Sequence, residues 1–351
     1  MNARRRLLAL LLCGLPFGAL AQGFAGLGTT AEGFAIPERG RALTFPADHG
    51  PHPAFRIEWW YLTAPLTGED GRDYGIQWTL FRSALAPEER DGWSSPQIWM
   101  AHAALTEPDR HHVAERLARG GIGQAGVTAA PFAAHIDDWQ MTGTPGKGID
   151  QLHLTARGKD FAYDLRLEAS GPIVLHGDAG YSVKSPKGQA SYYYSQPGYT
   201  VTGTIETERG TVRVSGQGWL DREWSSQPLA EDQRGWDWFS LSFDSGDKMM
   251  GFRLRDGGPG FTSATWIGSD GSAKPLPDGA LTLEPLETTT VEDRAIPTRW
   301  RVVLPAHGLD ITVGAMNPQA WMGTSFPYWE GPVTITGSHT GRGYLEMTGY
   351  E

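Results

Sequence analysis

Apolar and polar residues alternate along most of the chain, and a period of two is typical of half-buried β-strands. Residues 55–62 form one such run, an Asp-Gly pair follows at 70–71, and apolar side chains then occupy alternate positions from Tyr74 to Leu80. An Asp-Gly pair between two alternating runs predicts a β-hairpin. Further strands are predicted at 98–106, 150–157, 161–169, 199–206, 211–219, 238–243, 249–255, 299–304, 309–315, 332–337 and 343–350.

Helical character is predicted only near 111–119, around Val113 and Leu117. Many short strands without strand–helix alternation indicate an antiparallel sandwich or barrel. The composition agrees, because 46 Gly and 24 Pro among 351 residues supply turns, and 40% hydrophobic residues are typical of a folded globule. The sequence therefore predicts an all-β protein.

An internal repeat of domain size divides the chain. Residues 58–62 (Glu-Trp-Trp-Tyr-Leu) and 237–241 (Asp-Trp-Phe-Ser-Leu) both precede a turn and a strand containing Phe-Arg, and they begin 179 residues apart (237 − 58). A repeat of this length predicts two related β-barrels in tandem. The alternative is a chance similarity of two Trp-rich hairpins. The boundary is predicted in the polar stretch 225–235.

The first 21 residues are predicted to be a secretory signal peptide. Three Arg at 4–6 precede an apolar run from Leu7 to Leu20, and Ala19-Leu20-Ala21 forms a cleavage site before Gln22. This apolar run is too short to span a membrane, and Gly14 and Pro16 interrupt it. The single Cys lies inside this segment, so the mature chain uses no disulfide. We expect a periplasmic or secreted protein, with general secretory and twin-arginine export both left open.

Charge and motifs exclude several function classes. A formal net charge of −10 argues against nucleic acid as a partner. A Gly-x-Gly-x-x-Gly match at 121–126 lacks the strand–turn–helix context of a dinucleotide site. The chain contains no Gly-x-Ser-x-Gly and no His-Glu-x-x-His, and its His residues follow no common metal-site spacing. We therefore predict no metal and no cofactor.

Aromatic residues beside acids, Arg or Gly suggest either barrel core or the lining of a ligand cavity. A closed barrel of about eight strands can hold one small ligand. The candidate ligand-binding residues are Trp59, Trp60, Trp219, Trp224, Trp238, Tyr328, Trp329 and Glu330.

Three ionisable residues, Asp221, Arg222 and Glu223, stand between two Trp at a predicted strand end. They form either a structural ion-pair corner, which the spacing alone favours, or a charged site in an apolar wall. In the second case a carboxyl pressed against indoles stays neutral and suits a general acid, while Arg222 holds the neighbouring acid ionised. Tyr192 and Tyr194 supply hydroxyls of the same kind.

Five ordered motifs, at 58–61, 218–224, 235–239, 328–331 and 343–350, resemble the CrtC/AttH lipocalin-like family. That family contains carotenoid 1,2-hydratases, AttH-like proteins, members labelled predicted secreted hydrolases, and fungal kievitone hydratases. The resemblance covers about 40–351 and implies two lipocalin-like barrels with a ligand cavity bordered by both. The implied domains are an N-terminal segment at 22–39, a CrtC-like lipocalin-like domain at 40–227 and a C-terminal lipocalin-like domain at 228–351.

The resemblance also implies candidate acid machinery. In carotenoid hydratases this is a Tyr-x-Asp pair, preceded on an earlier strand by a His-x-Trp pair. Here the later pair is Trp219-x-Asp221, which keeps only the Asp, and the earlier region is Tyr192-x-Tyr194, with neither His nor Trp. Both pairs therefore depart from the carotenoid hydratase pattern.

We expect an exported, monomeric protein that encloses an isoprenoid or lipid-like small molecule and acts as a hydratase-type lyase on an isolated C=C bond. The alternative is a non-catalytic lipophile-binding or carrier protein, and a membrane-associated partner is also left open. A hydrolase lacks a nucleophile signature here. The catalytic residues expected are Asp221 as proton donor, Tyr192, Tyr194 and Trp219 facing the carbocation, and Glu223 or Glu330 positioning the water.

Overall fold

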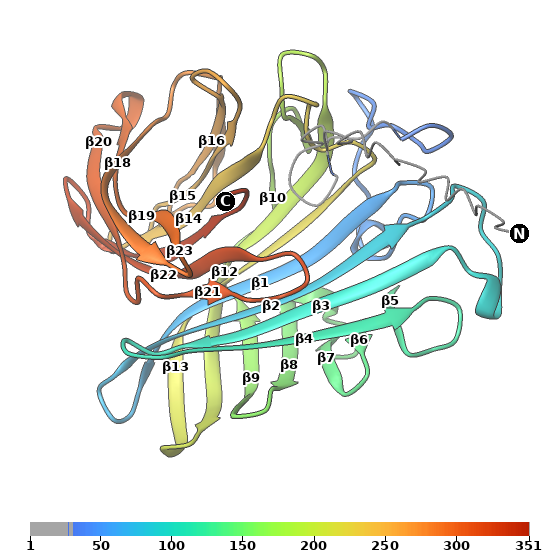
Figure 1. The fold of residues 1–351 in the computed structure, drawn as a ribbon, viewed down its shortest axis with the longest axis horizontal. Helices are drawn as coiled ribbons and strands as arrows, with labels where there is room; N and C mark the ends of the chain where they lie inside the picture. The colour runs from blue at the N-terminus through green and yellow to red at the C-terminus, as the bar shows by residue number, and fades with distance from the viewer. Residues whose placement is uncertain (1–26, 28–30, 351) are drawn as a thin grey trace, which may run out of the picture.

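The computed structural model describes Leu27 and residues 31–350, which form two antiparallel β-sheets (Figure 1). The first sheet is nearly closed into a barrel and the second is a half-barrel. The predicted all-β class with two barrel-like sheets is therefore confirmed. The predicted signal peptide at 1–21, with its cut after Ala21, lies outside the described residues. Within the described part of the chain, no helix is both long and apolar enough to cross a membrane.

The first sheet has the strand order β4-β3-β2-β1-β13-β12-β9-β8-β7-β6-β5, with β10 and β11 also paired to β12. The last long strand, β13, thus returns to lie beside the first. The strands are β1 (Ile57–Gly68), β2 (Asp73–Ala84), β3 (Gln97–Thr106), β4 (His111–Arg119), β5 (Ala125–Ala129), β6 (Phe132–Ile136), β7 (Trp139–Gly143), β8 (Gln151–Arg157), β9 (Phe161–Ala169), β10 (Val174–Leu175), β11 (Tyr181–Val183), β12 (Ala190–Thr207) and β13 (Gly210–Ser225).

The second sheet has the order β17-β16-β15-β14-β23-β22-β20-β19-β18, with β21 paired to β22. Its strands are β14 (Gly235–Phe243), β15 (Lys248–Arg255), β16 (Phe261–Ile267), β17 (Ala273–Leu276), β18 (Thr282–Val291), β19 (Arg294–Leu304), β20 (Leu309–Ala315), β21 (Trp321–Met322), β22 (Tyr328–Gly337) and β23 (Gly341–Met347). Short 3-10 helices lie before or between the strands of the two sheets: η2 (Ala47–His49), η3 (Gly92–Ser94), η4 (Gly148–Asp150) and η5 (Pro305–His307).

The hairpin predicted from 55–62 and 74–80 is β1–β2, and every other strand predicted from alternation overlaps an observed strand. The prediction of helical character at 111–119 is wrong, because this segment is β4 and pairs with β3. Residues four apart share a face in a strand as well as in a helix, so the spacing of Val113 and Leu117 did not distinguish the two.

The two sheets repeat the same design. In each, the last strand (β13 or β23) pairs with the first (β1 or β14), and the first strand also pairs with the second. Glu58 on β1 lies opposite Arg82, and Asp237 on β14 lies opposite Arg253. Both carboxylates are buried and ion-paired to these arginines. The internal repeat is therefore a repeat of structure, with an acid–arginine pair at equivalent positions.

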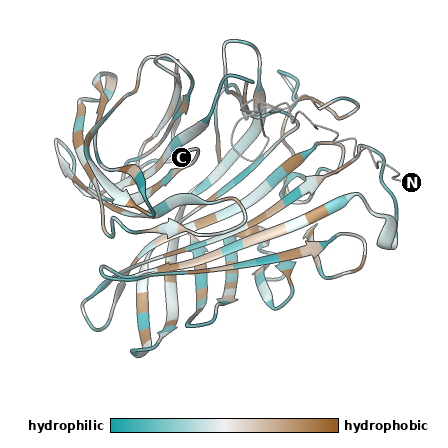
Figure 2. Cartoon of the chain, in the orientation of Figure 1, coloured by the Kyte–Doolittle hydropathy of each residue, from teal (hydrophilic) through white to brown (hydrophobic). Residues whose placement is uncertain are grey.

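Hydrophilic and hydrophobic bands alternate along several strands (Figure 2), and successive side chains of a strand face opposite sides of the sheet. The face of the first sheet inside the barrel is filled by large side chains such as Trp60, Trp78 and Trp224. The half-barrel has its own core around Trp300 and Trp329. Neither interior is therefore an open ligand chamber lined by these residues.

A third apolar cluster joins the outer face of the first sheet to the second sheet. In it, Tyr61 packs edge-on against Trp238 with ring centroids 5.3 Å apart. The sheets approach closely at Gly75, where a Cβ atom would lie 2.5 Å from Pro332 Cγ and 2.6 Å from the Tyr344 hydroxyl. Glycine at this position lets β2 contact β22 and β23 without a clash.

Candidate functional site

A cavity of about 420 Å³ lies between the outer face of the first sheet and the second sheet. Its volume is within the range of small-molecule sites, and its wall is mainly apolar and aromatic. The resemblance implied a cavity bordered by both domains, and residues from both sheets line this one. Aromatic side chains on its wall include Trp59, Tyr61 and Phe81 from β1 and β2, and Trp238, Phe252 and Phe326 from the C-terminal part.

Asp221 on β13 is a buried carboxyl of the cavity wall, and only 2% of its surface is exposed. Tyr193 donates its hydroxyl to Oδ2 at 2.6 Å, and Trp219 donates its indole N–H to Oδ1 at 2.6 Å. Ser195 also donates to Oδ1. Trp238 from the second sheet in turn donates to the Tyr193 hydroxyl at 3.0 Å. Three neutral donors of the first sheet therefore hold this carboxyl, and the second sheet contributes through Trp238, which holds Tyr193.

The protonation of Asp221 follows from its burial. Burial, and to a smaller extent nearby Glu223, raise the pKa of Asp221 to about 7 against the opposing effect of its hydrogen bonds. No Lys or Arg in the described part of the chain forms an ion pair with Asp221. A carboxyl with this pKa is partly protonated near neutral pH, as a general acid requires.

Glu223 lies two residues further along β13 and also lines the cavity, but its partner is a cation. Lys184 forms an ion pair with Glu223 at 2.8 Å, and Ser191 donates to the same carboxylate. The Lys184 ammonium lies 4.3 Å from the ring centroid of Phe252. The wall therefore carries one carboxyl held by neutral donors beside one held by a lysine.

Two further carboxyls come from the second sheet, the half-buried Glu346 and the buried Glu330. Glu346 on β23 lines the cavity and accepts a hydrogen bond from the Trp236 indole, and burial raises its pKa to about 7. Glu330 on β22 lies behind the wall, where Tyr61 donates to it. Burial raises the pKa of Glu330 well above its ordinary value. Both groups are therefore poised to hold a proton.

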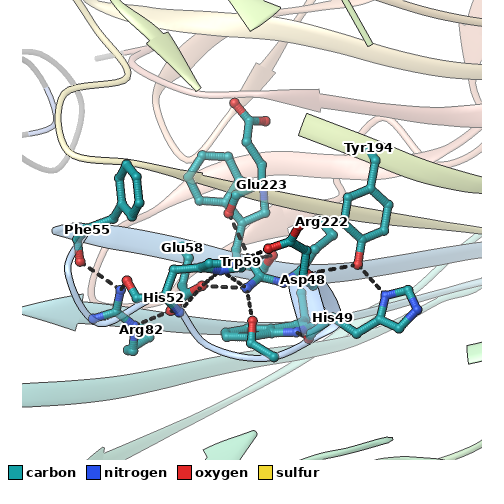
Figure 3. A network of polar contacts seen from close by, with 12 residues as sticks. Asp48, His49, His52, Phe55, Glu58, Trp59, Arg82, Tyr194, Arg222 and Glu223 are labelled. Atoms are coloured by element: carbon teal, nitrogen blue, oxygen red, sulfur yellow. Dashed lines mark hydrogen bonds and ion pairs between the residues drawn. The ribbon is translucent and has the colours of Figure 1, made fainter. Parts of the chain in front are cut away.

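The alternative in which Asp221, Arg222 and Glu223 form an ion-pair corner is wrong. Arg222 points to the opposite face of β13 and donates to Glu58, and its guanidinium lies 3.8 Å from the Trp60 ring centroid. Figure 3 shows Arg222 within this network and the Glu223 carboxylate directed away from it. Neighbouring residues of a strand face opposite sides, which separates Arg222 from both acids.

Glu58 is the centre of the network behind the sheet. Burial raises the pKa of Glu58, but Arg222 and Arg82 more than offset this and hold it well below its ordinary value. His52 contacts both Glu58 and Asp48, which ties η2 to the barrel (Figure 3). The network lies on the interior side of the barrel wall, away from the cavity, and joins η2 to β1, β2 and β13.

The structure also corrects the prediction of which tyrosines face the ligand. Tyr192 and Tyr194, predicted to face the ligand, lie in the barrel core, where Tyr194 contacts His49 at 2.6 Å. Tyr193, between them, faces the cavity. The prediction was one residue out of register, and on a strand a shift of one residue exchanges the two faces.

The other predicted ligand-binding residues divide into those that line the cavity and those that lie in a core or behind the cavity wall. Trp59, Trp238 and Tyr328 line the cavity, whereas Trp219 contacts it only through Asp221. Trp60 and Trp224 belong to the barrel core, Trp329 belongs to the half-barrel core, and Glu330 lies behind the wall. The sequence analysis missed five residues that line the cavity: Tyr61, Lys184, Tyr193, Trp236 and Glu346. The signal that could have found Tyr193 is the pairing of Ser195 with Asp221 across β12 and β13. Paired residues share a face, and Tyr193 lies two positions from Ser195, so it faces the same side as Asp221.

A buried His–Ser–Asp arrangement adjoins Asp221 but lacks the order of a hydrolase triad. Ser195 donates to Asp221, and His176 Nε2 lies 2.6 Å from the Ser195 hydroxyl. Burial lowers the pKa of His176 to about 3, so the ring is neutral. Since Ser195 already gives its proton to the carboxyl, His176 donates to Ser195 rather than activating it as a nucleophile.

The family model described as AttH-like matches residues 36–350, which is most of the chain. The chain belongs to the AttH-like family. Its fold matches the crystal structure of an AttH protein from Nitrosomonas europaea, which is 31% identical, with a TM-score of 0.81 over 91% of this chain and 100% of the other.

A more distant match is the kievitone hydratase of Nectria haematococca, which is 15% identical, with a TM-score of 0.66 over 90% of this chain and 98% of the other. At this identity the match shows a shared fold. A comparison with curated proteins found no match. Within the described residues of this AttH-like chain, no group of three or more His, Cys, Asp or Glu is arranged to hold a metal ion.

Proposed function

We propose that this AttH-like protein is a hydratase-type lyase that adds water across an isolated C=C bond of an apolar small molecule. The observation that carries the proposal is Asp221, a buried carboxyl on an apolar cavity wall whose pKa is raised to about 7. An isolated alkene reacts with water only after protonation, and a buried neutral carboxyl is a suitable proton source.

The reaction balances with groups on the wall. Asp221 gives its proton to one alkene carbon, and positive charge develops on the other, where the π faces of Trp59 and Trp238 stabilise it. Water then forms the C–O bond, and its excess proton passes to Glu223. The product is an alcohol, Asp221 is left ionised, and Glu223 is left protonated.

The size of the cavity favours a compact isoprenoid. At about 420 Å³ it lies in the lower part of the range that encloses drug-sized ligands. A carotenoid of the kind used by carotenoid 1,2-hydratases would have to extend beyond it. The fold shared with a kievitone hydratase is consistent with a hydratase.

The test is hydration of farnesol and of lycopene by the purified protein in D₂O, followed by mass spectrometry for an added water and a carbon-bound deuterium. Wild type is expected to hydrate farnesol, and Asp221→Asn to lose about 100-fold or more of the rate, the usual contribution of a general acid. The control Asp237→Asn changes the buried acid of the second sheet, away from the cavity wall.

A wild-type protein that binds farnesol without turnover would contradict the proposal and favour the carrier alternative. Extraction of the purified protein with organic solvent supports the proposal if it releases an isoprenoid alkene or its alcohol. We also propose that the mature chain starts at Gln22, works outside the cytoplasm and is a monomer. N-terminal sequencing of the periplasmic or secreted fraction and its elution volume in gel filtration test these points.

A further inference from the structure

We propose that the cavity has a second polar subsite, formed by Thr79 and Tyr328, which binds the hydroxyl group of an isoprenoid alcohol. This inference rests on the proposed function, because it names the substrate class of the same cavity. The subsite lies at the opposite end of the cavity from Asp221. His102 and Glu115 beside it decide which partner of each hydrogen bond is the donor.

The strand register separates the two polar ends of the cavity. Asp221 on β13 pairs with Tyr61 on β1, which pairs with Thr79 on β2. Thr79 in turn pairs with His102 on β3. Paired residues point to the same face of a sheet, and all four line the cavity. Three strand spacings therefore place Asp221 and His102 about 14 Å apart.

An apolar floor connects these ends. Trp59, Phe81 and Met100 form the neighbouring row of the same face, where Phe81 pairs with both of the others. All three side chains line the cavity. A ligand that fills the cavity is therefore elongated, apolar along its length, and polar at the end that reaches Tyr328.

The neighbours of Tyr328 fix the direction of its hydroxyl proton. The Tyr328 oxygen lies 3.0 Å from His102 Nδ1, and His102 Nε2 lies 3.2 Å from Glu115 Oε1. The hydrogen bond with His102 lowers the pKa of Glu115 to about 2, so this carboxylate only accepts. Burial lowers the pKa of His102, so the ring is neutral and its single N–H donates to Glu115. His102 Nδ1 is therefore an acceptor, and Tyr328 donates to it.

Tyr328 and Thr79 consequently offer a ligand opposite halves of a hydrogen bond. A hydroxyl oxygen has two lone pairs, and Gln77 Nε2, at 3.5 Å from the Tyr328 oxygen, is at the limit of a hydrogen bond. Tyr328 can therefore accept from a ligand. Gln77 also donates to the Thr79 oxygen, and within the described residues the Thr79 hydroxyl donates to no side chain. Since Gln77 contacts both oxygens, the acceptor and the donor lie close together.

An alcohol is the ligand group that matches this pair. Its hydroxyl donates to Tyr328 and accepts from Thr79, whereas an ether, an aldehyde or a ketone only accepts, and a hydrocarbon does neither. A carboxylate also only accepts, and the ionised Glu115 beside His102 repels a second negative charge. The subsite therefore selects an alcohol over its oxidised or alkylated forms.

The distance between the two ends indicates the length of the alcohol. Bonds of about 1.5 Å that meet at about 111° advance an extended carbon chain by about 1.25 Å each. In farnesol about ten such bonds separate the oxygen from the remote C=C bond, which gives about 13 Å, whereas in geraniol the same separation is about 8 Å. Farnesol with its hydroxyl at Tyr328 therefore brings its remote C=C bond to Asp221, about 14 Å away.

Ligand binding tests the subsite without any turnover. Affinities for farnesol and farnesyl methyl ether are measured by quenching of tryptophan fluorescence in the Asp221→Asn protein, which keeps the ligands unreacted. A purely apolar cavity would prefer the ether, because it is the more apolar ligand. The subsite instead predicts that farnesol binds about fivefold or more tightly, the contribution of one neutral hydrogen bond.

Two substitutions, each with a matched control, separate the roles of the subsite residues. Tyr328→Phe removes the acceptor and is expected to weaken farnesol about fivefold and leave the ether unchanged. Tyr199→Phe, whose hydroxyl donates to a backbone carbonyl in the barrel core, should keep the preference for farnesol. His102→Leu releases the Tyr328 proton, so farnesal, which only accepts, should gain about fivefold in affinity relative to farnesol. His112→Leu, which removes a buried histidine away from the cavity wall, should leave that ratio unchanged.

The proposal is overturned if the ether binds as tightly as farnesol, or if Tyr199→Phe reduces the preference as much as Tyr328→Phe does. It is also overturned if His102→Leu leaves the ratio of farnesal to farnesol affinity unchanged. The comparison of ligands alone needs no change to the subsite, so it decides the proposal even where Tyr328→Phe does not fold. Because binding needs no turnover, a preference for farnesol without hydration would count against the hydratase alone.

Discussion

Replacing Asp221 by Asn is expected to make the protein more stable at alkaline pH and slightly less stable at acidic pH. The folded-state pKa of Asp221 is about 7, whereas its ordinary value is 3.8. Between these values the folded protein holds a proton that the unfolded chain has released. Stability is therefore lost as the pH rises from about 4 to about 7 and is constant above that range.

The magnitude follows from the two pKa values. They differ by about 3, and each pKa unit corresponds to about 1.4 kcal/mol, so ionisation costs the wild-type protein about 4 kcal/mol at pH 8. Asn has no proton to lose in this pH range, so the variant does not have this cost. It still accepts from Ser195 and Trp219, but its amide N–H replaces the acceptor of Tyr193, a loss of about 1 kcal/mol. The expected net change is a gain of about 3 kcal/mol at pH 8 and a loss of about 1 kcal/mol at pH 4.

Urea denaturation of both proteins, followed by tryptophan fluorescence at intervals from pH 4 to pH 8, measures this difference. The change in the free energy of unfolding should cross zero between the two ends of the range. An equal change at pH 4 and pH 8 would refute a proton held by Asp221. A loss of about 3–5 kcal/mol at pH 8 would instead show that a cation pairs with this carboxylate.

Three further perturbations have defined outcomes. Glu58→Gln leaves two buried arginines without their carboxylate, and urea denaturation at pH 7 should show a loss of about 3–5 kcal/mol; a loss within error of zero would contradict the buried ion cluster. Gly75→Ala should cost about 1–3 kcal/mol through overpacking between the sheets, whereas Gly257→Ala, with open space around its Cβ position, should cost less than about 0.5 kcal/mol in the same assay. Expressed separately, residues 22–227 and 228–351 should each be poorly soluble, because division exposes the apolar cluster between the sheets; two stable monomeric halves in gel filtration would argue against a required interface.

Much of the architecture could be predicted from local patterns. Alternation locates strands because side chains of a strand face opposite sides in turn, and this needs no knowledge of distant residues. The repeated Glu-Trp-Trp and Asp-Trp-Phe hairpins predicted two related sheets, and the equivalent ion pairs of Glu58 with Arg82 and Asp237 with Arg253 show why both acids are present. The candidate chemistry around Asp221 was also visible as a carboxyl between indoles.

Only the tertiary structure decided which face of each strand meets the cavity. Periodicity divides a strand into two sets of residues but does not show which set faces the cavity. In β1 and β2 both sets are largely buried, because the second sheet covers this part of the first. Which set faces the cavity is decided by pairings such as Ser195 with Asp221 and by contacts such as Arg222 with Glu58, and these join residues far apart in the chain. For this reason Tyr192 and Tyr194 were chosen from the sequence while Tyr193 faces the cavity, and Arg222 looked like a neighbour of Asp221 although the sheet itself separates them.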